Sequence, residues 1–316
     1  MKKTVLRIVA AIAVVLAVAT AGGSFYMIDY ALSSAKRTLR PDIATEVRRY
    51  PELRPWIDSL QRAGALRDTF AVMSSGARLH AVFVRSPRAE GRTAVVVHGY
   101  SREAVDMLHI ARIYAQDMGY NIILPDLHGH GQSDGDDIQM GWNDRLDVLQ
   151  WIGMAERMFA EPGKHSRMVV HGISMGAATT MCVAGETTPD YVKCFVEDCG
   201  YTSVWDEFAH ELRDQFSLPA FPLLYTTSAL CRLKYGWWFG EASPLKQVAK
   251  CRKPMLFIHG GNDDFVPTPM VFPLYNAKPA PKQLWVARGS AHAVAYRDHK
   301  TEYVRLVKNF VTRCNR

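Results

Sequence analysis

Short apolar runs alternate with longer amphipathic segments along most of the chain after residue 68. The alternating segment 69–85 turns at Ser74-Ser75-Gly76 and predicts a β-hairpin. Apolar runs predict buried strands at 93–99, 121–129, 167–172, 191–200, 253–260 and 282–289. Amphipathic runs predict helices at 103–119, 144–160, 175–185 and 302–311. Short buried strands that alternate with helices are typical of an α/β fold, in which helices cover both faces of a mostly parallel sheet.

The interval 204–252 interrupts this alternation, because it has no strand pattern. It carries nine large aromatic side chains: Trp205, Phe208, Phe216, Phe221, Tyr225, Tyr235, Trp237, Trp238 and Phe239. An insertion of this size between sheet strands is often a lid over the site of a doubly wound protein. We therefore expect a helical lid over 204–252, with Trp237 and Trp238 in the wall of a substrate pocket.

An apolar run near the N-terminus predicts a membrane helix within residues 1–33. The 21 residues from Ile8 to Ile28 carry no charge, and at about 1.5 Å per residue they span a ~30 Å hydrocarbon layer. Positive charge on the short N-terminal side favours a cytoplasmic N-terminus, with the rest of the chain periplasmic or extracellular. The small residues of 17–21 also fit a signal-peptide cleavage site, which would release a secreted protein.

The segment 34–67 is polar, rich in arginine and interrupted by Pro41, Pro51 and Pro55. It predicts a basic helical stalk between the membrane helix and a domain over 68–316. Residues 1–67 hold 11 Lys/Arg and 5 Asp/Glu, a net charge of +6, whereas the whole chain carries +7. The domain is thus close to neutral, which argues against nucleic-acid binding, and the basic excess favours a membrane partner.

The six cysteines and the acidic and histidine residues predict no metal site and no cofactor. The sequence has no C-x-x-C pair, and Cys194 and Cys199 are too far apart on one extended strand to form a disulfide. Other cysteine pairings remain open. Asp126, His128 and His130 resemble part of a metal cluster, but no further His/Asp group completes it.

Side chains able to catalyse acyl transfer follow several of the predicted strands. Gly172-Ile173-Ser174-Met175-Gly176 has the strand–turn–helix pattern that exposes a nucleophilic serine on a tight elbow. Asp263 follows the strand at 253–260, and His292 follows the last strand. Since ligands meet the carboxyl ends of parallel strands, these loops can converge. Asp264 and, more distantly, Asp198 are the alternatives to Asp263.

The chain resembles the α/β-hydrolase superfamily, and within it the serine-aminopeptidase-like and cinnamoyl-esterase-like members of bacteria. The resemblance covers roughly 70–312 and is carried by VVVHGYS (95–101), DLHGHGQSDG (126–135), GISMGA (172–177), IHGGNDDFVP (258–267) and GSAHA (289–293). It implies a triad of Ser174, Asp263 and His292. His128 stands where the family usually has arginine. We expect this difference to affect the choice of substrate more than the catalytic mechanism.

The chemistry of these residues agrees with the resemblance. His292 can accept the proton of Ser174, and Asp263 can fix the imidazole tautomer and stabilise its charge. Backbone N–H groups of Tyr100 and Met175 are the expected oxyanion donors.

The sequence thus predicts a membrane-anchored serine hydrolase that cleaves a carboxylic ester or a related acyl bond of a small molecule through an acyl-enzyme on Ser174. A peptidase acting on short peptides is the alternative, with Glu207, Glu211 or Asp214 holding the substrate amine, and a non-enzymatic binding protein is a third. The sequence leaves the natural substrate and the oligomeric state open.

Overall fold

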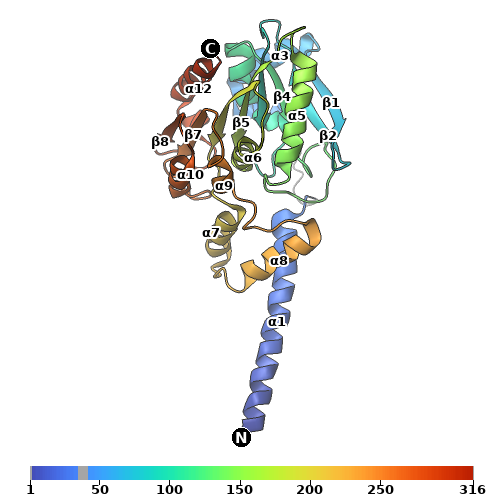
Figure 1. The fold of residues 1–316 in the computed structure, drawn as a ribbon, viewed down its shortest axis with the longest axis vertical. Helices are drawn as coiled ribbons and strands as arrows, with labels where there is room; N and C mark the ends of the chain where they lie inside the picture. Colours follow the sequence, from blue (N-terminus) through green and yellow to red (C-terminus); the bar gives the residue numbers. More distant parts are fainter. Residues whose placement is uncertain (1, 35–41, 316) are drawn as a thin grey trace.

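A computed structural model of the chain describes residues 2–34 and 42–315, which form one eight-stranded sheet with helices on both faces and a long N-terminal helix (Figure 1). The strand order is β1-β2-β4-β3-β5-β6-β7-β8. The strands are β1 Leu66–Val72, β2 Arg78–Val84, β3 Arg92–Val97, β4 Asn121–Pro125, β5 Arg167–Ile173, β6 Val192–Asp198, β7 Met255–Gly260 and β8 Lys282–Ala287. β1 and β2 form the predicted hairpin, β2 also runs antiparallel to β4, and the remaining pairs are parallel. This is the α/β-hydrolase fold.

Successive side chains of the central strands enter opposite layers of the core. Val95 and Val97 belong to one buried cluster, whereas Ala94 and Val96 belong to the other. A strand that is buried on both faces needs apolar residues at every position, which explains the continuous apolar runs of the sequence. The helices after the lid are α10 Val271–Ala277, α11 Ala295–Asp298 and α12 Lys300–Cys314, with the 3₁₀ turn η4 at Thr268–Met270.

The helices between the central strands lie close to their predicted positions, with one difference. α5 spans Asp144–Phe159 and α6 spans Met175–Ala184, as predicted. The predicted helix 103–119 is divided into a 3₁₀ turn, an α-helix and a π-turn: η2 Ala104–Met107, α4 Leu108–Arg112 and η3 Ile113–Asp117. The apolar face of the whole segment is nevertheless buried, so the periodicity identified the buried face but not the changes in helix type.

The N-terminal region contains α1 Lys2–Leu32, α2 Ile43–Arg49, η1 Pro51–Leu53 and α3 Arg54–Arg62. α1 is the one described helix long and apolar enough to cross a membrane, by length and composition alone, and a signal sequence meets the same criterion. The described part of the expected stalk is not a stalk. Its apolar side chains are buried in the same cluster as those of α4 and α12: Val47, Tyr50, Leu53, Trp56 and Ile57. The described residues 42–67 therefore belong to the domain body.

The expected lid interval folds into α7 Val204–Phe216, α8 Leu223–Tyr235 and α9 Pro244–Val248, without a strand. α9 packs against α6 and thus belongs to the domain body. α7 and α8 lie at the end of the domain from which α1 projects, and α8 crosses α1 (Figure 1). None of the six cysteines, all of which lie in the described residues, forms a disulfide. Five of them are buried, and Cys314 is partly exposed.

Candidate active site

Ser174 lies on a tight turn between β5 and α6, with a strained backbone at φ 58° and ψ −122°. The two flanking glycines permit this turn. A Cβ on Gly172 would lie 2.0 Å from the carbonyl oxygen of Gly176, and a Cβ on Gly176 would lie 2.2 Å from that of Val97. The glycines of the elbow are therefore required by close backbone contacts, which bring the β5–α6 turn against the end of β3.

Ser174, His292 and Asp263 form a continuous hydrogen-bonded chain, in the order that the sequence predicted. In the tautomer that the carboxylate favours, His292 Nδ1 donates to Asp263 Oδ2 over 2.8 Å. His292 Nε2 then accepts from the hydroxyl of Ser174, also over 2.8 Å. A base that is oriented by a carboxylate and bonded to a hydroxyl is the arrangement that activates a serine nucleophile.

The loop after β7 orients the carboxylate of Asp263. Its Oδ1 accepts from the backbone N–H groups of Phe265 and Val266 over 3.2 and 3.0 Å, which leaves Oδ2 for His292. Asp264 is exposed, and its carbonyl oxygen instead accepts a bond from His210. Asp198 accepts from the hydroxyl of Tyr303 over 2.9 Å, so neither alternative acid bonds to His292. Burial raises the pKa of Asp198 to about 7.

The two residues predicted as oxyanion donors lie beside Ser174. Met175 is the first residue of α6, where a backbone N–H has no acceptor within the helix. Tyr100 follows β3, and the preceding Gly99 lies so close that a Cβ there would be 3.2 Å from that of Ser174. Both residues line the cavity at Ser174. Their position suits donation to an oxyanion, which remains a prediction about function.

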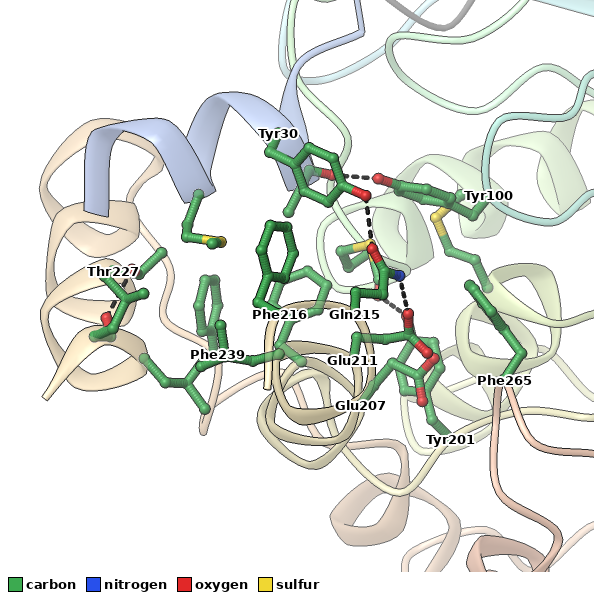
Figure 2. Close-up of a pocket in the computed structure, with 18 of the residues that line it drawn as sticks. Tyr30, Tyr100, Tyr201, Glu207, Glu211, Gln215, Phe216, Thr227, Phe239 and Phe265 are labelled. Atoms are coloured by element: carbon green, nitrogen blue, oxygen red, sulfur yellow. Dashed lines mark hydrogen bonds between the residues drawn. The ribbon is translucent and has the colours of Figure 1, made fainter. Parts of the chain in front are cut away.

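A mostly apolar cavity of about 350 Å³ extends from Ser174 to the lid and α1. This volume lies within the range of about 300–1,000 Å³ that is usual for ligand pockets. Its apolar wall includes Met27, Ala31, Phe208, Phe216, Leu223 and Phe239 (Figure 2).

A polar stripe on α7 faces the same cavity. Glu207, Glu211 and Gln215 recur every four residues, so they lie on one face of the helix (Figure 2). Gln215 donates to Glu211 and accepts from the hydroxyl of Tyr30 over 2.6 Å. Burial, with the negative charge of Glu211 nearby, raises the pKa of Glu207 well above its usual range. Glu207 therefore keeps its proton to a higher pH than an ordinary glutamate does.

The predicted roles of Trp237 and Trp238 in the pocket wall are corrected by the structure, since neither is among the described residues that line it. Trp237 is 1% exposed and packs against Phe239 at a ring distance of 6.0 Å. Trp238 lies at the surface beneath the guanidinium of Arg232. The number of aromatic residues in 204–252 does not indicate which rings pack against the domain body and which rings face the pocket.

A second cavity of about 400 Å³ also reaches Ser174 and His292. Its lining is more polar, and it includes Arg49, Arg102 and Arg297. The carboxylate of Asp106 lies 3.6 Å from Arg49 and 3.9 Å from Arg102. The reacting serine therefore lies between a mostly apolar space and a second space whose lining carries charged side chains.

The other histidines near strand ends have structural partners. His98 is fully buried, bonded to the carbonyl of Gly99 and the N–H of Leu127. His259 bonds to the carbonyl of Val266, and His171 lies between the hydroxyls of Tyr114 and Tyr303.

The polar groups of the loop at 126–135 bond both within the loop and to neighbouring segments. Asp126 accepts from the N–H groups of Ala104 and Gln132 and contacts His80 over 2.7 Å. His128 lies 3.3 Å from Asp137, and its pKa is raised because the favourable contact with Asp137 outweighs the effect of burial. The polar residues of this loop thus hold a turn in place.

Sequence reasoning missed the part of α1 that lines the pocket and the ring of Phe265. Met27, Tyr30 and Ala31 lie in the C-terminal turns of α1, within or just after an apolar run that carries no mark of a binding site. Phe265 lies with its ring centroid 4.9 Å from that of His292 and also lines the pocket. Only the tertiary structure reveals these contacts.

The strand order, the elbow and the bonded Ser-His-Asp chain define a serine hydrolase of the α/β-hydrolase type. Comparison with known proteins gives the narrower assignment. The chain belongs to the prolyl oligopeptidase family, whose family model matches residues 109–316.

Curated relatives are similar to this chain in sequence, and solved structures are similar to it in fold. The uncharacterized protein YqkD of Bacillus subtilis is 29% identical over 230 residues, which cover 73% of this chain and 74% of that protein. The putative esterase YitV of the same organism is 25% identical, over 55% of this chain and 69% of its own. The Pyrococcus furiosus esterase Pf2001 shares the fold with a TM-score of 0.64 at 21% identity, over 79% of this chain and 92% of its own.

Proposed function

We propose that this protein is a serine esterase that cleaves carboxylic esters through an acyl-enzyme on Ser174. The observation that carries the proposal is the hydrogen-bonded chain Ser174–His292–Asp263, which lies where a mostly apolar cavity meets a second cavity that carries charged side chains. An ester has the same two-part character, because its acyl group is often apolar and its alcohol is often polar.

The bonded chain suits a two-step reaction. His292 Nε2 takes the proton of Ser174 as Oγ attacks the acyl carbon, and Asp263 stabilises the imidazolium. The N–H groups of Met175 and Tyr100 donate to the oxyanion. As the ester C–O bond breaks, His292 returns the proton to the departing alcohol. A water molecule, deprotonated by His292, then hydrolyses the acyl-enzyme and releases the acid.

A peptidase is the second candidate, favoured by the family of the chain and by two carboxyl groups in the cavity, those of Glu207 and Glu211. A peptidase that recognises a free amine needs a fixed negative charge. The raised pKa of Glu207 argues against such a charge, and burial also raises the pKa of Glu211. The third candidate is a binding protein without catalytic activity. Such a protein would not need a complete hydrogen-bonded chain of serine, histidine and aspartate.

The full-length protein in detergent distinguishes these candidates. We expect kcat/KM on p-nitrophenyl esters to exceed that on aminoacyl-p-nitroanilides, after each is divided by its rate of hydrolysis by hydroxide. Ser174→Ala is the control for contaminating activity. Strong anilide cleavage that collapses in Glu207→Gln or Glu211→Gln would instead indicate the peptidase, and no turnover of either class would indicate the binding protein.

We also propose that α1 anchors the protein with its catalytic domain outside the cytoplasm, because Lys2, Lys3 and Arg7 precede the apolar run. The uniform apolar surface of residues 8–19 supports the anchor, since a helix that packs only on a protein core would have a polar face.

A further inference from the structure

The last three turns of α1 are docked onto the lid and onto the loop that follows β3. The buried side chains Ser24, Ile28 and Leu32 recur every four residues and thus form one face of the helix. Ser24 shares a 2.7 Å hydrogen bond with Thr226 of α8. The hydroxyl of Tyr100, beside the catalytic serine, donates to the carbonyl of Ala31 over 2.6 Å (Figure 2). α1 is therefore attached directly to the active-site loop.

These same turns form one side of the apolar cavity. Met27, Tyr30 and Ala31 line it opposite lid residues of α7 and α8, and the cavity continues to Ser174 (Figure 2). α1 and α8 also approach closely at Gly23, where a Cβ would lie 3.1 Å from the side chain of Leu223. The wall of the cavity is thus shared between the lid and the helix proposed to enter the bilayer.

The rest of α1 projects away from the domain (Figure 1). Residues 2–19 are all exposed. The uncharged run that begins at Ile8 continues from the exposed residues 8–19, about 18 Å long at 1.5 Å per residue, into the turns that contact the lid. If this run occupies the ~30 Å hydrocarbon layer, the crossing of α1 and α8 lies where the membrane meets the domain.

Large exposed side chains gather on the two elements that meet at this crossing. α1 exposes Phe25 and Tyr26, and the lid exposes Phe221 at 72%, Tyr225 at 55% and Leu233 at 85%. Aromatic residues concentrate where a protein meets the membrane–water interface. This surface is therefore suited to lie against lipid, with the apolar cavity directly behind it.

From this arrangement we infer that the substrate is an acyl ester of a membrane lipid, whose acyl chain enters the apolar cavity alongside α1. This inference rests on the proposed esterase activity and names the substrate class of the same site. Ser174 Oγ bonds to the acyl carbon, the ester C–O bond breaks, and the deacylated lipid leaves as an alcohol with the proton that His292 took from Ser174. Water then releases the fatty acid from Ser174.

The first measurement is the dependence of the reaction on acyl length. Each methylene buried in the cavity should raise kcat/KM about fourfold until the cavity is full. The full-length protein should thus favour p-nitrophenyl octanoate over p-nitrophenyl acetate. Ala31→Trp and, independently, Met27→Trp place a ring in the cavity and should lower the octanoate-to-acetate ratio at least tenfold. Ala19→Trp, on the exposed part of the same helix, is the matched control and should leave the ratio unchanged.

The second measurement tests delivery from the bilayer. Protein reconstituted in phosphatidylcholine vesicles should hydrolyse p-nitrophenyl palmitate at least tenfold faster when the ester is in the same vesicles than when it is in separate ones. Ala31→Trp should remove most of this rate, whereas Ala19→Trp should retain it. Signal-peptide cleavage after Ala19 or Ala21 would remove the exposed residues of α1 but leave Met27 and Ala31 in the cavity wall. The vesicle measurement, unlike the acyl-length measurement, therefore tests whether α1 holds the protein in the bilayer.

The results separate this inference from the proposed activity. If wild-type protein cleaves neither ester and resists a fluorophosphonate probe, the esterase proposal itself fails. If acetate is cleaved but octanoate is no better, or if both tryptophan variants leave the ratio unchanged, the lipid-substrate inference is wrong and the esterase proposal stands. Equal rates from shared and separate vesicles would likewise overturn it.

Discussion

Replacing Asp263 with asparagine changes one atom of the site and should nearly abolish turnover. The structure determines how the new amide must lie. The backbone N–H groups of Phe265 and Val266 require an acceptor, so the amide oxygen should replace Oδ1 and the NH₂ group should face His292. An NH₂ donor at 2.8 Å from Nδ1 forces that nitrogen to be the acceptor. The ring proton then lies on Nε2, which faces Ser174 and can no longer take its proton.

The expected loss follows from this tautomer. The same substitution in a well-studied serine protease lowers kcat by about 10⁴. At 1.36 kcal/mol per factor of ten, this is roughly 5.4 kcal/mol of lost transition-state stabilisation. The fold should be unaffected, because the side chain keeps its shape and its two backbone bonds.

The assay is kcat on p-nitrophenyl acetate, with thermal unfolding as the measure of folding. Asp264→Asn is the matched control, since Asp264 is adjacent in sequence but exposed, and it should retain activity within about twofold. The reasoning is refuted if Asp264→Asn proves the more damaging change, or if Asp263→Asn loses less than tenfold while remaining folded.

Two further predictions concern the lid and the N-terminus. The pKa of Glu207 is raised in the folded protein, so the folded state retains a proton that the unfolded state releases above about pH 4.3. This difference lowers the free energy of unfolding as pH rises toward the folded pKa of Glu207. Glu207→Gln removes that effect, so the Tm of the variant minus the Tm of wild type should increase between pH 4 and pH 8. A Tm difference that does not change with pH would contradict a raised pKa at Glu207. The protein should also sediment with membranes and resist carbonate extraction, whereas a mature N-terminus at Thr20 or Gly22 would indicate a cleaved signal peptide instead.

The sheet and the bonded triad could be predicted from the sequence because their signals are local. A strand buried on both faces needs a continuous apolar run, and the elbow needs glycines wherever backbone atoms approach within about 2 Å of an added Cβ, as at Gly172 and Gly176. Asp263 could be chosen over Asp264 from its spacing to the residues that follow. Each of these features depends on a few neighbouring residues.

The pocket wall could not be predicted in this way, because it depends on which elements meet. The apolar run of α1 is uniform, so nothing in its pattern marks Met27 and Ala31 as pocket residues. Trp237 and Phe239 are both large aromatic residues, two positions apart, yet Phe239 lines the cavity and Trp237 does not. The helices of 43–62 bury Trp56 and Ile57 against the domain, although prolines and arginines gave the segment the character of a stalk.

The central claim is that Ser174 is the nucleophile of a serine hydrolase, and covalent labelling tests it most directly. Full-length protein is treated with a fluorophosphonate probe, and the modified peptide is identified by mass spectrometry. We predict one label, on Ser174, and no labelling of the folded Ser174→Ala variant. Labelling that survives this substitution, or a wild-type protein that takes up no probe, would contradict the account.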